Sequence, residues 1–563
     1  MKPSISNRAW GRAVVDGLIQ IGASRFFMSP GARCSPLVAA LADSGIEPVV
    51  HYDERGMAFA ALGWASVTGQ PAVCITTSGS AVANLLPACV EAFHSGIPLI
   101  FLTADRPPEL RGTGANQTIE QPGIFGSFVR MDKDLPLPDD SGSIEELWES
   151  LRCIGRVLKS DTIGPVHLNV PFREPLLSAP SSPGISVPEL AGGDIATGEE
   201  FAIPASFFES SRGVVVLGRL PALEQSEAFA AQELASRLGW PLIADALSGA
   251  QFLPGVIRHA DWTLQRANVP KPERVLHFGG SLVSKRLGEW LAGCKGAHCL
   301  QVRRFPERLD PWDQKPVFIH SGIVRFCESM ERRVPAKPSG SWLEFWKEAD
   351  VGVSKILSDI TENDKSLSEP AIARAVAKAA VAGALPVFLG NSMPVRDFNS
   401  CVDSVSHSRI PVFGNRGASG IDGNIATIAG VSMALGRPLL AILGDLSVLH
   451  DMNSLALLRG LPVTLVVVNN DGGGIFRFLP LGLDDALRER LWETPHGMDF
   501  SHAAAQFGID YHIVAKTSEL DGILSATNQW PRILECRTSR SGNLALHKEI
   551  ADKVCRLAIA SLP

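Results

Sequence analysis

Short apolar runs recur along this chain, and each one ends within a residue or two in Gly, Ser, Asn or Asp. Clear examples lie at residues 72–76, 99–103, 214–217, 274–278, 387–389, 439–443 and 463–468. Between these runs the apolar residues follow the helical period, and strands that alternate with helices are typical of parallel α/β sheets. Ligands bind to such sheets where the strands give way to loops. Functional residues are therefore expected in the loops that follow these runs.

The chain is long enough for several domains. Its 563 residues correspond to three or four domains at roughly 150 residues each. Residues 174–200 hold four prolines among Ser, Gly and Ala, as an exposed connection would, and a weaker break lies at 334–340. The sequence therefore predicts three α/β domains with the limits 1–180, 190–335 and 340–563.

The first and third parts resemble each other. Five residues of the first part are Gly63, Gly69, Pro71, Ser78 and Ser80. They recur at the same spacing as Gly430, Gly436, Pro438, Asp445 and Ser447. We expect a duplicated α/β domain on either side of a different central domain.

Composition excludes several classes of protein. Lys and Arg number 52 against 59 Asp and Glu, so the chain lacks the overall basic charge of a nucleic-acid binder. No run approaches the ~18 apolar residues of a membrane helix, and no signal peptide is expected. The ten cysteines contain no CxxC pair, which favours reduced thiols in a cytoplasmic protein. We therefore expect no nucleic-acid partner and no membrane insertion.

The strongest motif has two halves, at 439–447 and 465–472. Gly444, Asp445 and Ser447 follow an apolar run and open a predicted helix, whose free N–H groups would suit an anion. Asp445 and Asn470 offer the oxygen ligands that Mg²⁺ takes together with phosphate oxygens. The alternative is an ordinary strand, turn and helix, with Asp445 as the cap and Asn-Asp-Gly as a turn.

Together and in this order, the two halves resemble the diphosphate and metal motif of thiamin-diphosphate-dependent enzymes. Their usual Gly-Asp-Gly reads Gly-Asp-Leu here. The resemblance implies thiamin diphosphate and Mg²⁺ or Mn²⁺ as cofactors, with Asp445, Asn470 and Gly472 at the metal. The cofactor residues that it implies are Glu54, Gly390, Asn391, Ser392, Ile421, Gly444, Asp445, Leu446, Ser447, Asn470, Ile475 and Phe476.

A second motif lies at 49–63, where Glu54 begins a stretch of small and apolar residues. A buried carboxylate is costly without a partner. In the thiamin family the corresponding Glu binds N1′ of the aminopyrimidine and favours the imino tautomer, so the resemblance implies this role for Glu54. The alternative is a first-turn residue that complements the helix dipole.

The family also implies an assembly. Its Glu and its diphosphate site come from different subunits, so the resemblance implies a homodimer or homotetramer with active sites at the subunit interface. Ile421, within 417–423, stands where a bulky apolar residue would support the bent cofactor. The alternative is a core residue at the start of a helix.

Cationic and amide residues gather at loop positions, and Arg suits carboxylate recognition. Taken alone, any one Arg is better explained as a surface or ion-pair residue. As a set, however, the segments 29–33, 415–423 and 469–476 resemble the 2-succinyl-5-enolpyruvyl-6-hydroxy-3-cyclohexene-1-carboxylate (SEPHCHC) synthase family. The match covers the first and third parts well and the central part mainly at 281–286. Position 32 is Ala where many relatives carry Ser.

This resemblance implies a thiamin-dependent transferase of menaquinone or phylloquinone biosynthesis. It would decarboxylate 2-oxoglutarate and add the succinyl unit to isochorismate in conjugate fashion. The catalytic residues implied are Glu54, Arg33, Gln117 and Arg396. The substrate residues implied are Arg33, Arg106, Asn116, Gln117, Lys285, Arg286, Ser392, Arg396 and Arg416.

Other functions are considered on the same residues. An acetohydroxyacid synthase or a 2-oxo-acid decarboxylase would share the three-domain plan. Some of these enzymes hold FAD against the middle domain, but residues 277–281 are at best a weak phosphate-loop signal for FAD. A non-catalytic binding protein would be expected to lack Glu54 or a metal ligand, and both are present. A nicotinamide dehydrogenase would need a Gly-x-Gly-x-x-Gly motif that opens a helix and is followed by an acidic residue at a set spacing, and the sequence contains no such motif.

Overall fold

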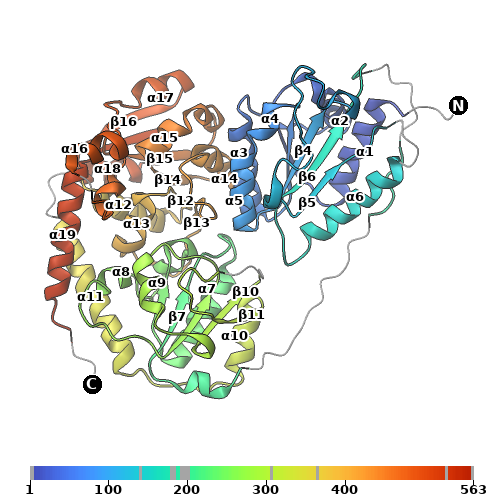
Figure 1. The fold of residues 1–563 in the computed structure, drawn as a ribbon. Coiled ribbons are helices and arrows are strands. Elements are labelled where there is room, and N and C mark those ends of the chain that lie inside the picture. The colour runs from blue at the N-terminus through green and yellow to red at the C-terminus, as the bar shows by residue number, and fades with distance from the viewer. Residues whose placement is uncertain are drawn as a thin grey trace. The chain divides into compact units, whose positions relative to one another are not determined.

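A computed structural model describes residues 5–138, 143–177, 185–190, 203–304, 309–362, 367–482, 484–526 and 530–559. Its strands form three sheets, and every strand pair in them is parallel (Figure 1). The chain forms two compact units. Unit 1 takes its residues from 1–198, 415–436 and 451–458, and unit 2 takes the rest. Pro180 and Pro183 of the predicted connection lie outside the described residues.

Unit 1 is built on a six-stranded sheet in the order β2-β1-β3-β4-β6-β5. Its strands are β1 (Arg25–Met28), β2 (Val49–Val50), β3 (Ala72–Thr76), β4 (Leu99–Asp105), β5 (Met131–Asp134) and β6 (Val166–Pro171). Its helices are α1 (Asn7–Gln20), α2 (Ser35–Asp43), α3 (Glu54–Thr68), α4 (Ser80–Ala83), α5 (Leu86–Ser95), α6 (Ser143–Leu158) and α14 (Asn424–Leu435).

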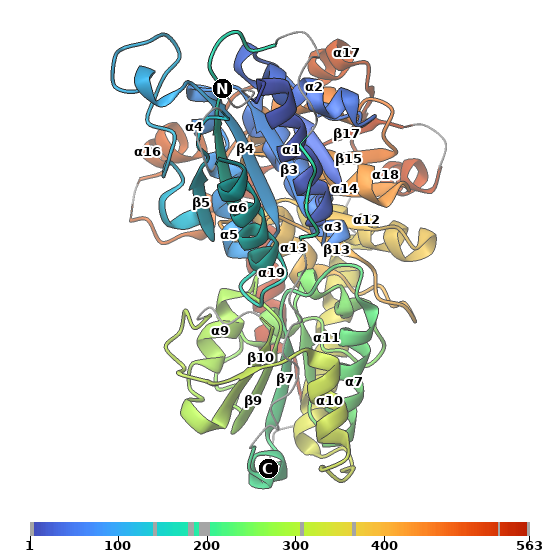
Figure 2. The same cartoon turned by 90° about the vertical axis from the view of Figure 1, so that its right-hand side faces the viewer.

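Helices cover both faces of this sheet because its strands are apolar on both sides. Alternate strand residues such as Phe26 and Ile75 pack with Val14 of α1 and Leu151 of α6 in one core. Figure 2 shows α1 and α6 across this face. Helix α3 contacts β1, β3 and β4, and it also packs along α14. Burial on both faces is why central strands such as β3 and β4 read as unbroken apolar runs in the sequence.

Unit 2 contains the central sheet, in the order β11-β10-β9-β7-β8. Its strands are β7 (Gly213–Leu217), β8 (Leu242–Ala244), β9 (Arg274–Phe278), β10 (Cys299–Arg303) and β11 (Val317–His320). Its helices are α7 (Gln225–Leu238), α8 (Ala260–Thr263), α9 (Lys285–Leu291) and α10 (Ile323–Glu331).

The third sheet also lies in unit 2, in the order β13-β12-β14-β15-β17-β16. Its strands are β12 (Val387–Leu389), β13 (Val412–Phe413), β14 (Leu439–Gly444), β15 (Val463–Asn469), β16 (Asp510–Val514) and β17 (Arg532–Arg537). Helix α11 (Ser341–Glu362) packs Trp342 and Trp346 into the core of the central sheet. The helices of the third part are α12 (Glu369–Gly383), α13 (Met393–Cys401), α15 (Asp445–His450), α16 (Asp485–Arg488), α17 (Ser501–Phe507), α18 (Thr517–Ser525) and α19 (Arg540–Arg556).

The first and third sheets have the same topology. When the strands of each are numbered along the chain, both follow the order 2-1-3-4-6-5. The predicted fold class is therefore confirmed: three parallel α/β sheets, of which the first and third are similar. Among the described residues, no helix combines the length and the apolarity needed to cross a membrane.

Candidate active site

Asp445 stands at the end of β14 and begins α15. Its side chain is buried, and Oδ1 accepts a hydrogen bond from the N–H of Leu446 at 2.7 Å. Oδ2 accepts from the N–H of Gly472 at 2.8 Å. Burial raises the pKa of this carboxyl, and the two backbone donors act against that rise. The hydrogen bond to Gly472 joins the two halves of the predicted motif.

Asn470 follows β15 directly and is buried. Its Nδ2 donates to Oε1 of Glu369 at 2.8 Å, and its carbonyl accepts from Nη1 of Arg540 at 3.1 Å. Within the described part of the chain, its Oδ1 is buried and has no hydrogen-bond partner. An acceptor buried without a partner costs free energy unless a ligand satisfies it.

These groups fit a divalent cation bound with a diphosphate. A carboxylate of Asp445, Oδ1 of Asn470 and the carbonyl of Gly472 are the oxygen donors that Mg²⁺ takes. That carbonyl also accepts from the N–H of Gly474 at 2.9 Å and keeps a second lone pair. The described residues contain no group of three or more His, Cys, Asp or Glu side chains placed for a metal. A cation at this point would therefore need the amide and backbone oxygens.

The predicted cofactor residues of unit 2 follow three neighbouring strands, because β14 pairs with both β12 and β15. After β12, Asn391 is buried and Ser392 has a φ of +72°. A Cβ added to Gly444, at the end of β14, would meet nothing within 4 Å. That open space is what a bound group requires. The residues that the structure places at these strand ends are Gly390, Asn391, Ser392, Gly444, Asp445, Leu446, Ser447, Asn470, Gly472, Ile475 and Phe476.

Three further side chains of this region were not predicted. Glu369 and Arg540 hold Asn470 as described above. His496 lies 3.2 Å from Oδ2 of Asp445 through Nε2, and its Nδ1 accepts from the N–H of Met498. The latter bond places the proton of the neutral ring on Nε2, so His496 donates to Asp445. No local motif marks any of these three residues.

Glu54 begins α3 in unit 1, as the sequence predicts. Asp53 caps the helix, and its Oδ1 accepts from the N–H groups of Arg55 and Gly56. The Glu54 side chain lies beyond this cap, and its Oε2 accepts from Nδ2 of Asn84 at 3.2 Å. Asp53 supplies the cap, and Glu54 is the acidic residue of the first turn, where it also complements the helix dipole.

Three predicted substrate residues come together at the ends of β1, β3 and β4. Arg106 donates to Oγ of Ser78, and Gln117 donates through Nε2 to the carbonyl of Ser78 at 3.0 Å. Arg33 is buried and donates to the carbonyl of Phe172 at 2.9 Å. Burial, and then the neighbouring charge of Arg33, lower the pKa of Arg106. We call Arg33, Arg106 and Gln117 the basic cluster.

The other predicted substrate residues lie in several separate segments of the chain. In unit 2, Arg286 pairs with Asp261 at 2.5 Å, and the side chain of Lys285 is 84% exposed. Arg396 is exposed on α13 and donates to the carbonyl of Ser392. In unit 1, Asn116 is exposed beside Gln117, and Arg416 is half-buried in the turn at 415–423.

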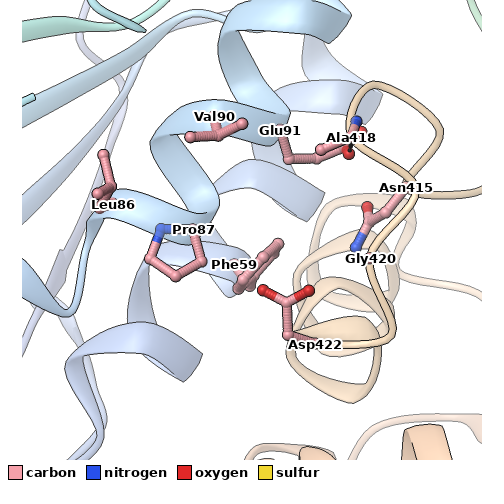
Figure 3. Close-up of a pocket in the computed structure, with 9 residues that line it drawn as sticks. All are labelled: Phe59, Leu86, Pro87, Val90, Glu91, Asn415, Ala418, Gly420 and Asp422. Carbon is pink, nitrogen blue, oxygen red and sulfur yellow. Dashed lines mark hydrogen bonds between the residues drawn. The ribbon is translucent and has the colours of Figure 1, made fainter. Parts of the chain in front are cut away.

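A cavity of about 300 Å³ lies beside this turn in unit 1. Figure 3 shows its lining: Phe59, Leu86, Pro87, Val90, Glu91, Asn415, Ala418, Gly420 and Asp422. Glu91, which was not predicted, accepts from the N–H groups of Gly417 and Ala418 at 2.7 Å each. Ile421 in the same turn is 37% exposed, which argues against a core residue. Its role at the cofactor stays a prediction.

Comparison with protein families covers most of the chain. Residues 8–124 match the N-terminal TPP binding domain of thiamine pyrophosphate enzymes, where TPP is thiamin diphosphate. Residues 203–385 match the model described as the middle domain of thiamine pyrophosphate, and residues 408–534 match the C-terminal TPP binding domain.

Comparison with curated proteins finds relatives over almost the whole length, and those named here are SEPHCHC synthases. One from Rubrobacter xylanophilus is 41% identical, with 97% of this chain and 98% of the relative covered. One from Salinibacter ruber is 36% identical, with 97% and 96% covered. One from Cronobacter sakazakii is 36% identical, with 99% and 100% covered. The chain therefore belongs to the SEPHCHC synthase family of thiamin-diphosphate-dependent enzymes.

Proposed function

We propose that this protein is a SEPHCHC synthase of menaquinone biosynthesis. It decarboxylates 2-oxoglutarate and adds the succinyl unit to isochorismate in conjugate fashion, which releases CO₂. The observation that supports the proposal is the hydrogen bond from the N–H of Gly472 to Asp445, which joins the ends of β14 and β15 in a chain of this family. The full-length similarity does not favour an acetohydroxyacid synthase or a 2-oxo-acid decarboxylase.

We propose that the strand ends of the third sheet hold the diphosphate and a Mg²⁺ or Mn²⁺ ion. Asp445, Asn470 and Gly472 would bind the ion, and the open space at Gly444 would admit the diphosphate. The bound thiamin group supplies an electron sink for cleavage next to a keto carbon. The residues around it need only position the substrates and neutralise their charge.

We propose that Glu54 accepts a hydrogen bond from the pyrimidine ring of the cofactor. Asp53 fixes the start of α3, and Asn84 donates to one carboxylate oxygen of Glu54 at 3.2 Å. A carboxylate held in this way can stabilise a proton on a ring nitrogen.

The basic cluster is our proposed site for substrate carboxylates. Both substrates carry two carboxylates, and guanidinium groups bind carboxylates through paired hydrogen bonds. Arg33 and Arg106 lie close enough for the charge of one to affect the pKa of the other. Glu174 already pairs with Arg33 at 3.0 Å and acts against this repulsion, so a substrate carboxylate would replace Glu174 or bind beside it at Arg106. We propose further that Asn116, Lys285, Arg286, Ser392, Arg396 and Arg416 contribute to the same substrate pocket.

We propose a homo-oligomer in which Glu54 of one copy and Asp445 of another serve the same cofactor. Val50 and Tyr52, which precede Glu54, are 56% and 59% exposed. If a second copy covers these two side chains, their apolar surface is removed from water, which favours association. Domain limits of 1–180, 190–335 and 340–563 and a cytoplasmic location also stay predictions.

The test is an assay with omissions. The purified full-length protein is supplied with thiamin diphosphate, Mg²⁺, isochorismate and either 2-oxoglutarate or pyruvate, and the loss of isochorismate is followed. Loss that requires every component and prefers 2-oxoglutarate would support the proposal. Turnover of pyruvate without loss of isochorismate would favour an acetohydroxyacid synthase or a decarboxylase instead.

A further inference from the structure

Asn470 is held at both its side chain and its main chain. Nδ2 donates to Glu369, and the carbonyl accepts from Arg540. Because Nδ2 faces Glu369, Oδ1 must face away from it, and there it is buried without a partner among the described residues. The orientation of the amide therefore decides whether an acceptor is offered at this point.

Glu369 makes the opposite orientation unfavourable. It is the first residue of α12 and is 3% exposed. Its Oε1 also accepts from Oγ1 of Thr538 at 3.2 Å. A reversed amide would place Oδ1 against an oxygen that is already an acceptor, and Nδ2 would then point to the proposed cation.

Gly474 provides the space for this arrangement. A Cβ added there would lie 2.7 Å from Nδ2 of Asn470, which is closer than van der Waals contact allows. Gly474 has no positive φ, so its backbone would accept alanine. A substitution at Gly474 would therefore act on Asn470 through contact and not through backbone strain.

Arg540 is itself fixed by a buried carboxylate. Its Nε lies 3.0 Å from Glu493, which is fully buried and also pairs with Arg477 and Arg488. The carbonyl of Glu493 accepts from the N–H of Gly473 at 2.7 Å. The loop that follows β15 is thus fastened before any cation binds.

We propose that Glu369 and Arg540 are positioning residues for the divalent cation. Glu369 turns Oδ1 of Asn470 toward the ion, and Arg540 holds the main chain of Asn470 in place. This inference rests on the metal site of the proposed function. Its prediction is specific: what Glu369 must supply is a hydrogen-bond acceptor at Oε1, and not a negative charge.

The test measures binding of Mn²⁺ to the full-length protein with thiamin diphosphate, from the electron paramagnetic resonance signal of free Mn²⁺. Glu369→Met removes the acceptor and should weaken Mn²⁺ binding by about 10–100-fold, as is usual for groups that orient a metal ligand. Glu369→Gln keeps an acceptor and should bind Mn²⁺ as the wild type does. Gly474→Ala and Arg540→Gln should each weaken binding.

Thr538→Val is the matched control, because it removes the other donor to Glu369 and leaves Asn470 untouched. It should bind Mn²⁺ normally. Should Glu369→Met fail to fold, Gly474→Ala tests the same amide. In the assay, the concentration of Mn²⁺ at half-maximal rate should rise while the rate at saturation changes little.

The outcomes separate the two proposals. A wild type that binds no Mn²⁺ in the presence of thiamin diphosphate contradicts the metal site itself. A wild type that binds Mn²⁺, together with variants at Glu369 and Gly474 that bind it equally well, overturns the positioning role. Equal losses in Glu369→Met and Glu369→Gln would overturn it too, because charge would then be what matters.

Discussion

Gly63 of α3 and Gly430 of α14 lie where these two helices pack closely in unit 1. A Cβ on Gly63 would lie 2.2 Å from the carbonyl oxygen of Thr427, and one on Gly430 would lie 1.9 Å from that of Ala60. Thr427 lies about one helical turn before Gly430, and Ala60 lies about one helical turn before Gly63. The two glycines are matching positions of the duplicated parts, so the repeat packs against itself through equivalent residues.

Gly430→Ala should destabilise the protein because its methyl group would overlap the backbone of α3. Overpacking of this kind costs roughly 1–3 kcal/mol. The free energy of unfolding in urea is the measurement. Gly522→Ala in α18 is the matched control, since a Cβ there would meet nothing within 4 Å. That variant should be neutral or slightly stabilising, and equal losses in the two would contradict the close packing.

Glu54→Gln should keep thiamin diphosphate bound and lower the rate of turnover by about 10²–10⁴-fold, as expected when a group that stabilises a proton is lost. Calorimetric titration of the cofactor and steady-state kinetics measure the two quantities. Asp53→Asn is the control, because Asn caps a helix as well as Asp. Near-normal turnover of Glu54→Gln would remove Glu54 from the mechanism.

Asp445→Ala should abolish the binding of thiamin diphosphate that depends on Mg²⁺, because it removes a proposed ligand and the acceptor of the Gly472 N–H. Cofactor affinity with and without Mg²⁺ is the measurement. Asp485→Ala serves as the control, since the Asp485 side chain is 88% exposed on α16. Undiminished affinity in Asp445→Ala would mean that the cation binds elsewhere.

Stability should depend on pH through His277, a buried residue of β9. Burial lowers the pKa of His277 to about 4 from about 6.5 in an unfolded chain. Below pH 6.5 the unfolded chain takes up a proton that the folded one excludes. The contribution of neutral His277 to the free energy of unfolding is therefore complete above pH 6.5. It is lost as the pH falls toward 4, at up to about 1.4 kcal/mol per pH unit.

His277→Gln should remove this part of the pH dependence. The measurement is the free energy of unfolding of wild type and variant at several pH values between 4.5 and about 7.5, chosen to span the expected transition. The difference between the two proteins should change with pH only below about 6.5. A constant difference would mean that folding leaves the pKa of His277 unchanged.

The sequence predicts the strands of this fold where they are buried on both faces. The run at 463–468 becomes β15, and the run at 72–76 becomes β3. Edge strands escape such reasoning, because β5 has the sequence Met-Asp-Lys-Asp and shows no apolar run. A strand at the edge of a sheet has a neighbouring strand on one side only, so it can carry charged residues.

The candidate site likewise contains residues that the sequence predicts and residues that it does not. Asp445, Asn470 and Glu54 sit in local motifs that the sequence displays. Glu369 contacts Asn470 from 101 positions away, and Arg540 contacts its carbonyl from 70 positions away. Only the fold brings such residues together, so no spacing in the sequence could predict them.

The central claim is that one decarboxylation drives one addition, and the most direct test measures both in the same reaction. CO₂ released from 2-oxoglutarate and isochorismate consumed are followed together with the purified protein, thiamin diphosphate and Mg²⁺. The account predicts equal amounts of the two at all times, and a product whose mass equals 2-oxoglutarate plus isochorismate minus CO₂. Release of CO₂ while isochorismate stays unchanged would contradict it.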